Sequence, residues 1–314
     1  MIQTFETYMQ SKGLSPSSIG CYKRIAEVFN AWYGNDDIIN CQKKDILNYL
    51  NHLKNKDVQT ITRNHYLIAL HHYFEALTED GLIASNPTAF IKLQGVNRRK
   101  LSRIYTPEEL TELVDKYYLL EVKRAEENLT LSMRKGFHKI RFLALTRNYA
   151  MLQFFVWQGV TSGELLRLKT DDIQLHRATV TIPAGIRQGN TRTLPLHATQ
   201  IGSLIQYLNE IRPYFETKDT NSTLFLPIPQ NSFKANKEAK SAIFKPLILQ
   251  LKQLDRNFID FVQLRTSVIT YWIKNYGLRK AQYLAGHKCI TSTEDYLPNH
   301  IEDLADDITK FNPF

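Results

Sequence analysis

Three short segments near the end of the chain are the most informative about its fold and chemistry: Gln263-Leu-Arg265-Thr-Ser-Val-Ile-Thr270, Tyr283-Leu-Ala-Gly-His287-Lys288 and Ser292-Thr-Glu-Asp-Tyr296. They place a histidine 22 residues after an arginine, and a tyrosine nine residues after that histidine. A guanidinium group can bind two phosphate oxygens at once, a histidine adds a further hydrogen bond, and a phenol can form a covalent phosphate ester. Arg265, His287 and Tyr296 are therefore candidate catalytic residues for phosphate chemistry.

Length and composition indicate a globular protein with an anionic partner. The 314 residues, of which 43% are hydrophobic and 23% charged, predict two folded domains. The 40 Lys and Arg outnumber the 31 Asp and Glu, which gives a net charge of +9 and makes nucleic acid the leading candidate partner. No apolar run approaches the roughly 20 residues of a membrane-spanning helix, and the first residues do not resemble a signal peptide. We expect a cytoplasmic protein without a membrane partner.

Several common kinds of site have no counterpart in the sequence. It contains no GxxxxGK[ST] phosphate loop, no GxGxxG, no HExxH and no CxxC pair. The three cysteines are too few and too scattered for a disulfide framework or a zinc site. The sequence therefore predicts no metal and no cofactor.

The first hundred residues predict a small domain of four helices. Ser15 and Pro16 provide an N-cap and a first-turn proline. Apolar residues then recur at helical spacing over 19–32, 46–53 and 61–77. After Gly81, Asn86-Pro87 is expected to start a short fourth helix.

A basic segment follows, and it ends where a second domain begins. Residues 96–105 lack apolar periodicity and hold four cations: Arg98, Arg99, Lys100 and Arg103. They form either a solvated linker or a connector that crosses a phosphate backbone. Thr106 and Glu109 then make a capping box that starts a new helix.

The second domain mixes helices with a small β-sheet. Helices are predicted over 107–128, 137–158, 162–169, 198–215, 237–255 and 262–276. Two short β-type runs, at 178–183 and 193–196, flank a glycine-containing turn with Arg187 and Arg192 at its shoulders. The predicted fold is mainly α, with a helical N-terminal domain and an α+β second domain.

The pattern LxGHK…T…Y, with the arginine that precedes it, resembles the catalytic domain of the tyrosine recombinases, the phage integrase family. Gly13-Leu-Ser-Pro16, Tyr22, Asn86-Pro87 and the helix start at Thr106 resemble that family's core-binding domain and its junction, so the likeness spans the whole chain. It implies a DNA-binding domain at 1–95, a basic linker at 96–105 and a catalytic domain at 106–314 that ends in a tail helix.

The resemblance also implies an activity and its partners. Tyr296 would attack double-stranded DNA and form a 3′-phosphotyrosine, while Arg265, His287 and Arg187 hold the phosphate. Further DNA contacts are expected from Arg98, Arg99, Lys100, Arg103 and Arg192. Arg63 belongs to a polar stretch of the third helix that either contacts DNA or forms a solvated helix face. Four protomers would recombine two duplexes, as the integrase of a mobile genetic element does. The amphipathic segment 301–308 would dock on a neighbouring protomer or, alternatively, on its own domain.

The site departs from the family's pattern in ways that leave its activity open. Thr161 stands where the first catalytic arginine is expected, and Val262 where a histidine is expected. Arg187 replaces a lysine that acts as general acid. The lost charge could be supplied by Arg147, Arg167 or Lys169. The alternative is a catalytically impaired DNA-binding protein on the recombinase fold, an assembly partner or regulator. A helical DNA-binding protein without this kinship would place Arg265, His287 and Tyr296 far apart.

Overall fold

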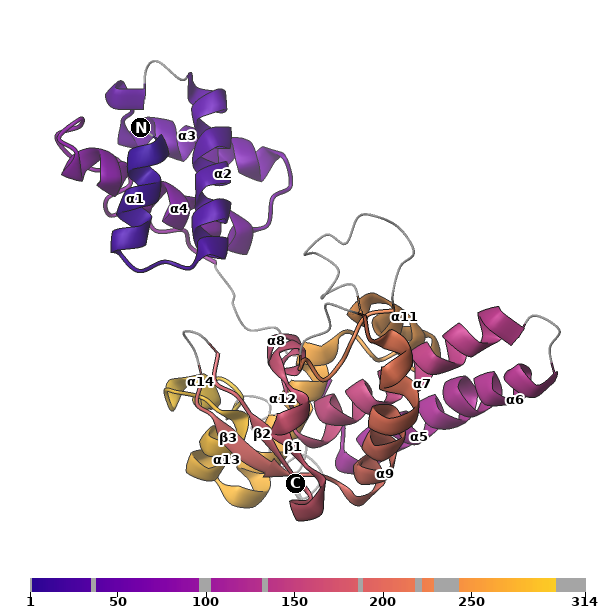
Figure 1. Ribbon diagram of the computed structural model, residues 1–314. Helices are drawn as coiled ribbons and strands as arrows, with labels where there is room; N and C mark the ends of the chain where they lie inside the picture. Colours follow the sequence, from indigo (N-terminus) through magenta and orange to yellow (C-terminus); the bar gives the residue numbers. More distant parts are fainter. Residues whose placement is uncertain are drawn as a thin grey trace, which may run out of the picture. The chain divides into compact units, whose positions relative to one another are not determined.

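The computed structural model in Figure 1 describes residues 2–34, 38–95, 103–131, 135–185, 189–217, 222–228 and 243–297. The chain divides into two compact units, Met1–Lys100 and Leu101–Phe314. Each unit has its own buried apolar core. The mainly helical class with a small sheet is confirmed.

The first unit contains helices α1 (Ile2–Ser11), α2 (Pro16–Tyr33), α3 (Lys43–Asn55) and α4 (Thr60–Glu79), with a 3-10 turn at Ile38–Asn40. The predicted cap is present, because Ser15 Oγ accepts a hydrogen bond from the Ser18 amide at 3.1 Å. The core is aromatic, and Phe29 contacts both Tyr49 and Phe74 edge to face. Burial of each such ring stabilises the unit by about 1.5–3 kcal/mol.

The predicted short helix after Asn86 is wrong, because that segment is a turn. Asn86 Oδ1 accepts from the Thr88 amide at 2.9 Å, and its amide nitrogen donates to the His71 carbonyl at 3.1 Å and to Glu75 at 2.9 Å. These bonds fasten the segment to α4 in a conformation that competes with a helix. The fourth helix is instead α1, which sequence analysis missed; its buried apolar residues are Phe5 and Met9.

The second unit opens with a long helical segment. It comprises α5 (Pro107–Tyr117), a π-helical stretch (Tyr118–Lys123) and α6 (Arg124–Leu131), followed by α7 (Lys135–Trp157) and α8 (Ser162–Arg167). The expected capping box is present: the Thr106 amide donates to Glu109 at 2.9 Å, and the Glu109 amide donates to Thr106 Oγ1 at 3.2 Å. The segment at 107–128 is therefore helical, as predicted.

A three-stranded antiparallel sheet follows, with β1 (Ile173–Gln174), β2 (Thr179–Ile182) and β3 (Arg192–Pro195) in that order. Sequence analysis predicted the last two strands and missed the two-residue β1. The register pairs Ile182 with Arg192 and Thr179 with Pro195. Because successive side chains alternate between faces, Arg192 shares the buried face of β3 with Leu194. β3 packs beside α13 (Figure 1).

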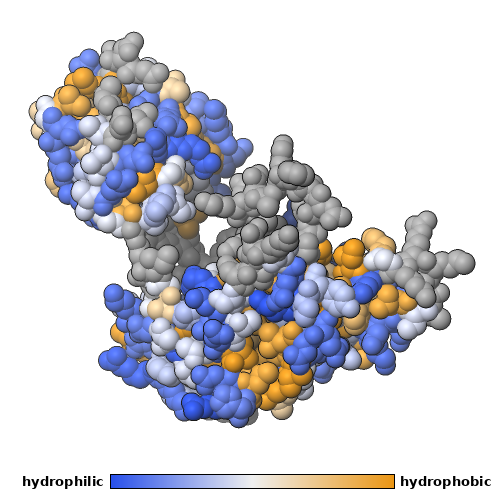
Figure 2. All heavy atoms as spheres, viewed as in Figure 1, coloured by the Kyte–Doolittle hydropathy of each residue, from blue (hydrophilic) through white to orange (hydrophobic). Residues whose placement is uncertain are grey.

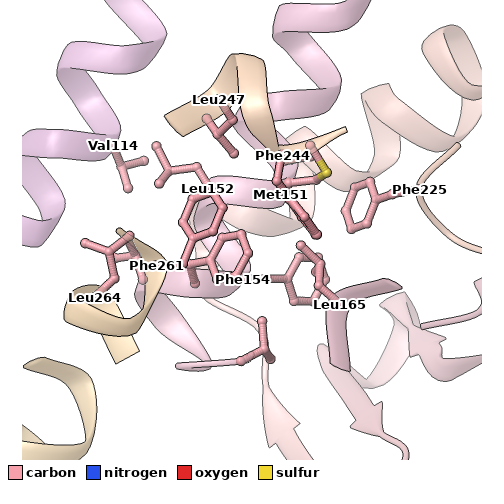
Figure 3. Packing of buried hydrophobic residues seen from close by; sticks show 14 of the residues in the cluster. Val114, Met151, Leu152, Phe154, Leu165, Phe225, Phe244, Leu247, Phe261 and Leu264 are labelled. Atoms are coloured by element: carbon pink, nitrogen blue, oxygen red, sulfur yellow. The ribbon is translucent and has the colours of Figure 1, made fainter. Parts of the chain in front are cut away.

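The rest of the unit is helical and completes the core. It contains α9 (Ala198–Gln206), a π stretch (Tyr207–Ile211), a 3-10 turn (Arg212–Phe215), α11 (Phe244–Leu254), α12 (Phe261–Tyr276), α13 (Leu278–Ala285) and α14 (Thr291–Glu294). Figure 3 shows Met151, Leu152 and Phe154 of α7 among side chains from α5, α11 and α12. Phe155 stacks on Phe261 with ring centroids 4.0 Å apart. This packing fixes α12, the helix that carries Arg265.

The surface in view is predominantly polar, with scattered apolar residues on both units (Figure 2). Across the described ranges, none of the helices has the length and apolar character needed to span a membrane.

Candidate active site

Arg265 lies on the buried face of α12 and is only 8% exposed. The helix starts at Asp260, whose carboxylate accepts a hydrogen bond from the Gln263 amide at 3.0 Å. Arg265 Nη1 donates to the Gly159 carbonyl at 2.5 Å, and Nη2 donates to the Ala285 carbonyl at 2.9 Å. Burial lowers the pKa of Arg265, and the charge of Glu164 opposes that effect. The side chain is thus a buried cation held between the turn before α8 and the end of α13.

His287 follows the left-handed Gly286 that ends α13. Its Nε2 lies 3.1 Å from Arg265 Nη2, and its Nδ1 lies 2.9 Å from Thr293 Oγ1. An arginine only donates, so Nε2 accepts and the ring proton lies on Nδ1, directed at Thr293. Burial, followed by the charges of Arg265 and Arg192, lowers the pKa of His287 to about 4. The ring is therefore a neutral acceptor near pH 7.

Tyr296 completes the group and lies two residues after the end of α14. Its ring stacks on that of His287, with centroids 5.8 Å apart and an interplanar angle of 18°. The Tyr296 amide donates to the Thr293 carbonyl at 3.1 Å, so Thr293 positions both rings. The structure thus brings Arg265, His287 and Tyr296 together, and the alternative of a protein without recombinase kinship, which requires them to lie far apart, is wrong.

Glu164 and Arg192 form a buried ion pair beside this group. Arg192 Nη1 donates to Glu164 Oε1 at 2.6 Å, and Arg265 Nη1 lies 3.4 Å from Glu164 Oε2. Burial acts to raise the pKa of Glu164, but the hydrogen bond and charge of Arg192 outweigh it and leave the pKa lowered. Two guanidinium groups therefore share one carboxylate, which leaves one net positive charge beside a neutral His287 and favours an anion.

The loop before β3 is tied to the turn that carries His287. The Asn190 amide donates to the Gly286 carbonyl at 2.9 Å, and a Cβ atom on Gly189 would lie 3.1 Å from the same oxygen. Both glycines have positive φ, at 91° and 71°. The β2–β3 connection is thereby anchored next to His287.

Comparison with known proteins gives this constellation a family. Residues 116–302 match the model of the phage integrase family, and residues 1–83 match the phage integrase N-terminal SAM-like domain. The chain belongs to the phage integrase family, the tyrosine recombinases. This confirms the resemblance inferred from the residues between 263 and 296.

Similar members of this family include two curated relatives. The tyrosine recombinase XerD of Listeria innocua serovar 6a is 26% identical over 96% of this chain and 94% of its own. The tyrosine recombinase XerC of Roseiflexus castenholzii is 24% identical over 91% of this chain and 84% of its own.

Solved structures of family members share the fold. The Tn1549 transposon integrase in complex with circular intermediate DNA matches with a TM-score of 0.66 at 15% identity, covering 94% of each chain. The XerH site-specific recombinase bound to difH substrate matches with a TM-score of 0.63 at 20% identity, covering 91% of this chain and 78% of that one.

The structure shows the surroundings of Thr161 and Val262, the two positions at which the sequence is expected to depart from the family's pattern. Thr161 is the N-cap of α8: its Oγ1 accepts from the Glu164 amide at 3.2 Å and lies 3.0 Å from Glu164 Oε2. Its hydroxyl is therefore engaged in capping. Val262 is 66% exposed on the first turn of α12 and offers no polar atom on its side chain.

The three candidate substitutes for the missing arginine lie in different surroundings. Arg147 is buried away from the group, where its Nη1 donates to the Leu226 carbonyl at 2.9 Å. Lys169 is exposed, and its backbone pairs with Thr223. Arg167 is exposed in the last turn of α8. None of these three joins the bonded group around Arg265 within the described part of the chain.

The predicted DNA contacts fall into three groups. Arg192 differs from its predicted role: it is 2% exposed, so its side chain is not available at the surface. Arg63 is partly buried and donates to the Val58 carbonyl at 3.1 Å, whereas the half-exposed Arg103 pairs with Glu109. The remaining predicted residues lie outside the described ones: Arg98, Arg99, Lys100, Arg187 and the 301–308 tail.

Sequence analysis did not identify Glu164, Thr293 or Gly159 as parts of this site. The sequence did contain a signal for Glu164, because a glutamate three residues after a threonine is typical of a capping box. Such a box places the Glu164 carboxylate next to Thr161. Thr293 lies in the quoted segment 292–296, and the pattern LxGHK…T…Y includes a threonine there, but no role was assigned to it. For the Gly159 carbonyl, the local sequence gives no signal. Among the described residues, no cluster of His, Cys, Asp and Glu is arranged to hold a metal ion.

Proposed function

We propose that this protein is a site-specific DNA recombinase that uses Tyr296 as its nucleophile. The observation that carries the proposal is the convergence of three residues from separate elements. Arg265 Nη2 lies 3.1 Å from His287 Nε2, and the His287 ring stacks on Tyr296. The family's site-specific recombinases and integrases among the relatives support the same reaction class.

The proposed step exchanges one phosphate ester for another. Tyr296 Oη attacks phosphorus, the bond from phosphorus to the 5′ oxygen breaks, and a 3′-phosphotyrosine forms. The Tyr296 proton passes to solvent, because His287 Nε2 already accepts a hydrogen bond from Arg265 and the pKa of the ring is lowered to about 4. His287 instead orients Arg265 and stacks on the Tyr296 ring. The leaving 5′ oxygen takes a proton from solvent, and reversal of the same steps joins a new strand. No ATP is consumed, since the ester conserves the bond energy.

The phosphate would be held by positive charge in this scheme. Arg265 contributes a guanidinium beside the net positive cluster with Glu164 and Arg192. Arg187 would add a second cation from the hairpin that Asn190 ties to Gly286. An arginine hardly releases a proton, so Arg187 would stabilise charge rather than act as general acid.

The finer parts of the proposal concern substrate and assembly. We propose that residues 1–95 bind double-stranded DNA, that 96–105 link this domain to the catalytic domain at 106–314, and that a tetramer acts in the cytoplasm. The segment after Tyr296 would dock on a neighbouring protomer. An origin in a mobile genetic element is supported by the likeness to a transposon integrase and by a lambda integrase dimer bound to a core site, which matches with a TM-score of 0.61.

A second candidate function is a DNA-binding protein on this fold that does not cleave, acting as assembly partner or regulator. The observation that favours it is Thr161, which places a capping hydroxyl where the family carries an arginine. Loss of one transition-state donor typically raises the barrier by about 3–4 kcal/mol.

A nicked suicide substrate separates the two functions. Cleavage beside the nick releases a short fragment that diffuses away, so the covalent protein–DNA complex accumulates and migrates slowly in a denaturing gel. We expect the complex with the natural protein and none with Tyr296→Phe. Tyr283→Phe is the matched control, because Tyr283 is 57% exposed on the neighbouring α13. DNA binding without any covalent complex would reject the recombinase and favour the non-cleaving function.

A further inference from the structure

The buried Arg192 lies against the site, and the proposed reaction gives it no role beyond its charge. Its side chain is enclosed, and one nitrogen, Nη1, donates to Glu164 at 2.6 Å. Within the described ranges, Nε and Nη2 have no hydrogen-bond partner. An enclosed cation that uses so few of its donors is a poor source of stability. Its position relative to Glu164 and Arg265 indicates another role.

Glu164 contacts both arginines, and the distances show that it binds Arg192 more closely. The contact to Arg192 is 2.6 Å, whereas the contact to Arg265 is 3.4 Å. The Glu164 carboxylate is fixed from its other side, because the Thr161 amide donates to it at 2.8 Å. Arg265 is thereby left to contact the Ala285 carbonyl and His287.

Arg192 also fills the space beneath the turn that carries His287. A Cβ atom on Gly286 would lie 2.3 Å from Arg192 Nη1 and 2.9 Å from its Cζ. The guanidinium therefore touches the backbone immediately before His287. One side chain of β3 thus contacts both the carboxylate that competes for Arg265 and the turn that places the histidine.

We propose that Arg192 is a positioning residue that holds the Glu164 carboxylate and thereby keeps Arg265 directed at His287 and Tyr296. The charge of Arg265 then stays available to the scissile phosphate. This inference rests on the proposed recombinase function. Without Arg192, Glu164 would be left with Arg265 as its arginine partner, and their opposite charges would cancel. Arg265 would then move toward Glu164 and lose its contact with His287.

A double-mutant cycle tests this idea in the suicide-substrate assay. Arg192→Gln should slow formation of the covalent complex about tenfold or more, as expected for residues in one ion-pair network. Glu164→Gln combined with Arg192→Gln removes the competing carboxylate as well, so the double variant should be faster than Arg192→Gln alone. A double variant as slow as Arg192→Gln would overturn the inference. Arg177→Gln is the matched control, because it removes one exposed charge beyond the far end of β2.

A conservative variant protects the test against a folding defect. Arg192→Lys keeps a cation for Glu164, so it should fold and recover most of the rate. Thermal melts of each variant show whether it is folded. A folded Arg192→Lys protein that is as slow as Arg192→Gln would overturn the inference. A positive charge beside Glu164 would then be insufficient to keep Arg265 in place.

A titration in the free protein distinguishes failure of this inference from failure of the proposed function. The charge of Arg192 helps to lower the pKa of His287 to about 4. Proton NMR should therefore show that pKa rising toward 6.5 in Arg192→Gln and falling again in the double variant, since Glu164 acts to raise it. If the natural protein forms no covalent complex, the recombinase proposal fails and this titration decides the role of Arg192. An unchanged pKa in Arg192→Gln would overturn that role.

Discussion

Replacement of Thr161 by arginine offers a direct test of whether a missing charge limits this site. The backbone at Thr161 is extended, with φ −79° and ψ 157°, so an arginine can occupy it without strain. The substitution removes the cap on α8, which costs about 1 kcal/mol of unfolding free energy. In a unit of this size, that loss lowers Tm by roughly 2–4 °C.

The added positive charge should raise the rate of the chemical step. One added donor at the phosphate is worth up to about 10²–10³ in rate. Glu164 lies within reach of residue 161 and will retain part of the new charge, so we expect a rise of about tenfold or more. The rate of covalent complex formation on nicked DNA measures it. Thr161→Ala is the control, because it removes the same cap without adding charge. A folded Thr161→Arg protein that cleaves no faster than Thr161→Ala would refute the reasoning.

Two further predictions concern His287 and the turn before it. The folded pKa of His287 is about 4, below its ordinary 6.5, so the unfolded state binds more protons between these values. The contribution of His287 to the free energy of unfolding is complete above about pH 6.5 and is lost as pH falls toward 4. The urea midpoint should therefore change less between pH 7 and pH 5 in His287→Gln than in the natural protein. The same change of midpoint in both proteins would contradict this prediction. Gly286→Ala should lower both Tm and cleavage, because its Cβ would lie 2.3 Å from Arg192 at a φ of 71°; unchanged melting and cleavage would show that the turn tolerates the contact.

The members of the proposed catalytic group could be predicted from sequence because the three residues lie within a span of 32 positions. Their types and spacing sufficed to identify Arg265, His287 and Tyr296 as candidates. The hydrogen bonds that hold these residues in place involve partners far away in the sequence. Arg265, for example, donates to the Gly159 carbonyl, 106 residues away. No local pattern encodes such a contact, so the sequence predicted the members of the group but not what holds them.

Arg192 shows a different kind of error. The predicted strand covered 193–196 and left Arg192 in the preceding turn, whereas β3 starts at Arg192. Alternation from the apolar Leu194 then places Arg192 on the same, buried face. Sequence analysis placed it at the shoulder of the hairpin turn and expected it to contact DNA. Charged side chains are rarely enclosed without a partner. That partner, Glu164, lies 28 residues earlier on another element, so the pair became visible only in the structure.

The error at Asn86 has a comparable cause. An Asn-Pro pair after a break is compatible with the start of a helix and with a turn. The choice is made by bonds from Asn86 to His71 and Glu75 on α4. Contacts across 11 and 15 residues decide a local conformation here, and propensity alone does not include them.

The identity of the residue that becomes linked to DNA tests the central claim most directly. The covalent complex trapped on nicked DNA would be digested with protease and nuclease, and its peptides mapped by mass spectrometry. The account predicts one modified peptide, with a nucleotide joined through its 3′ phosphate to Tyr296. Attachment at another residue, or no attachment by a folded protein that binds the same DNA, would contradict it.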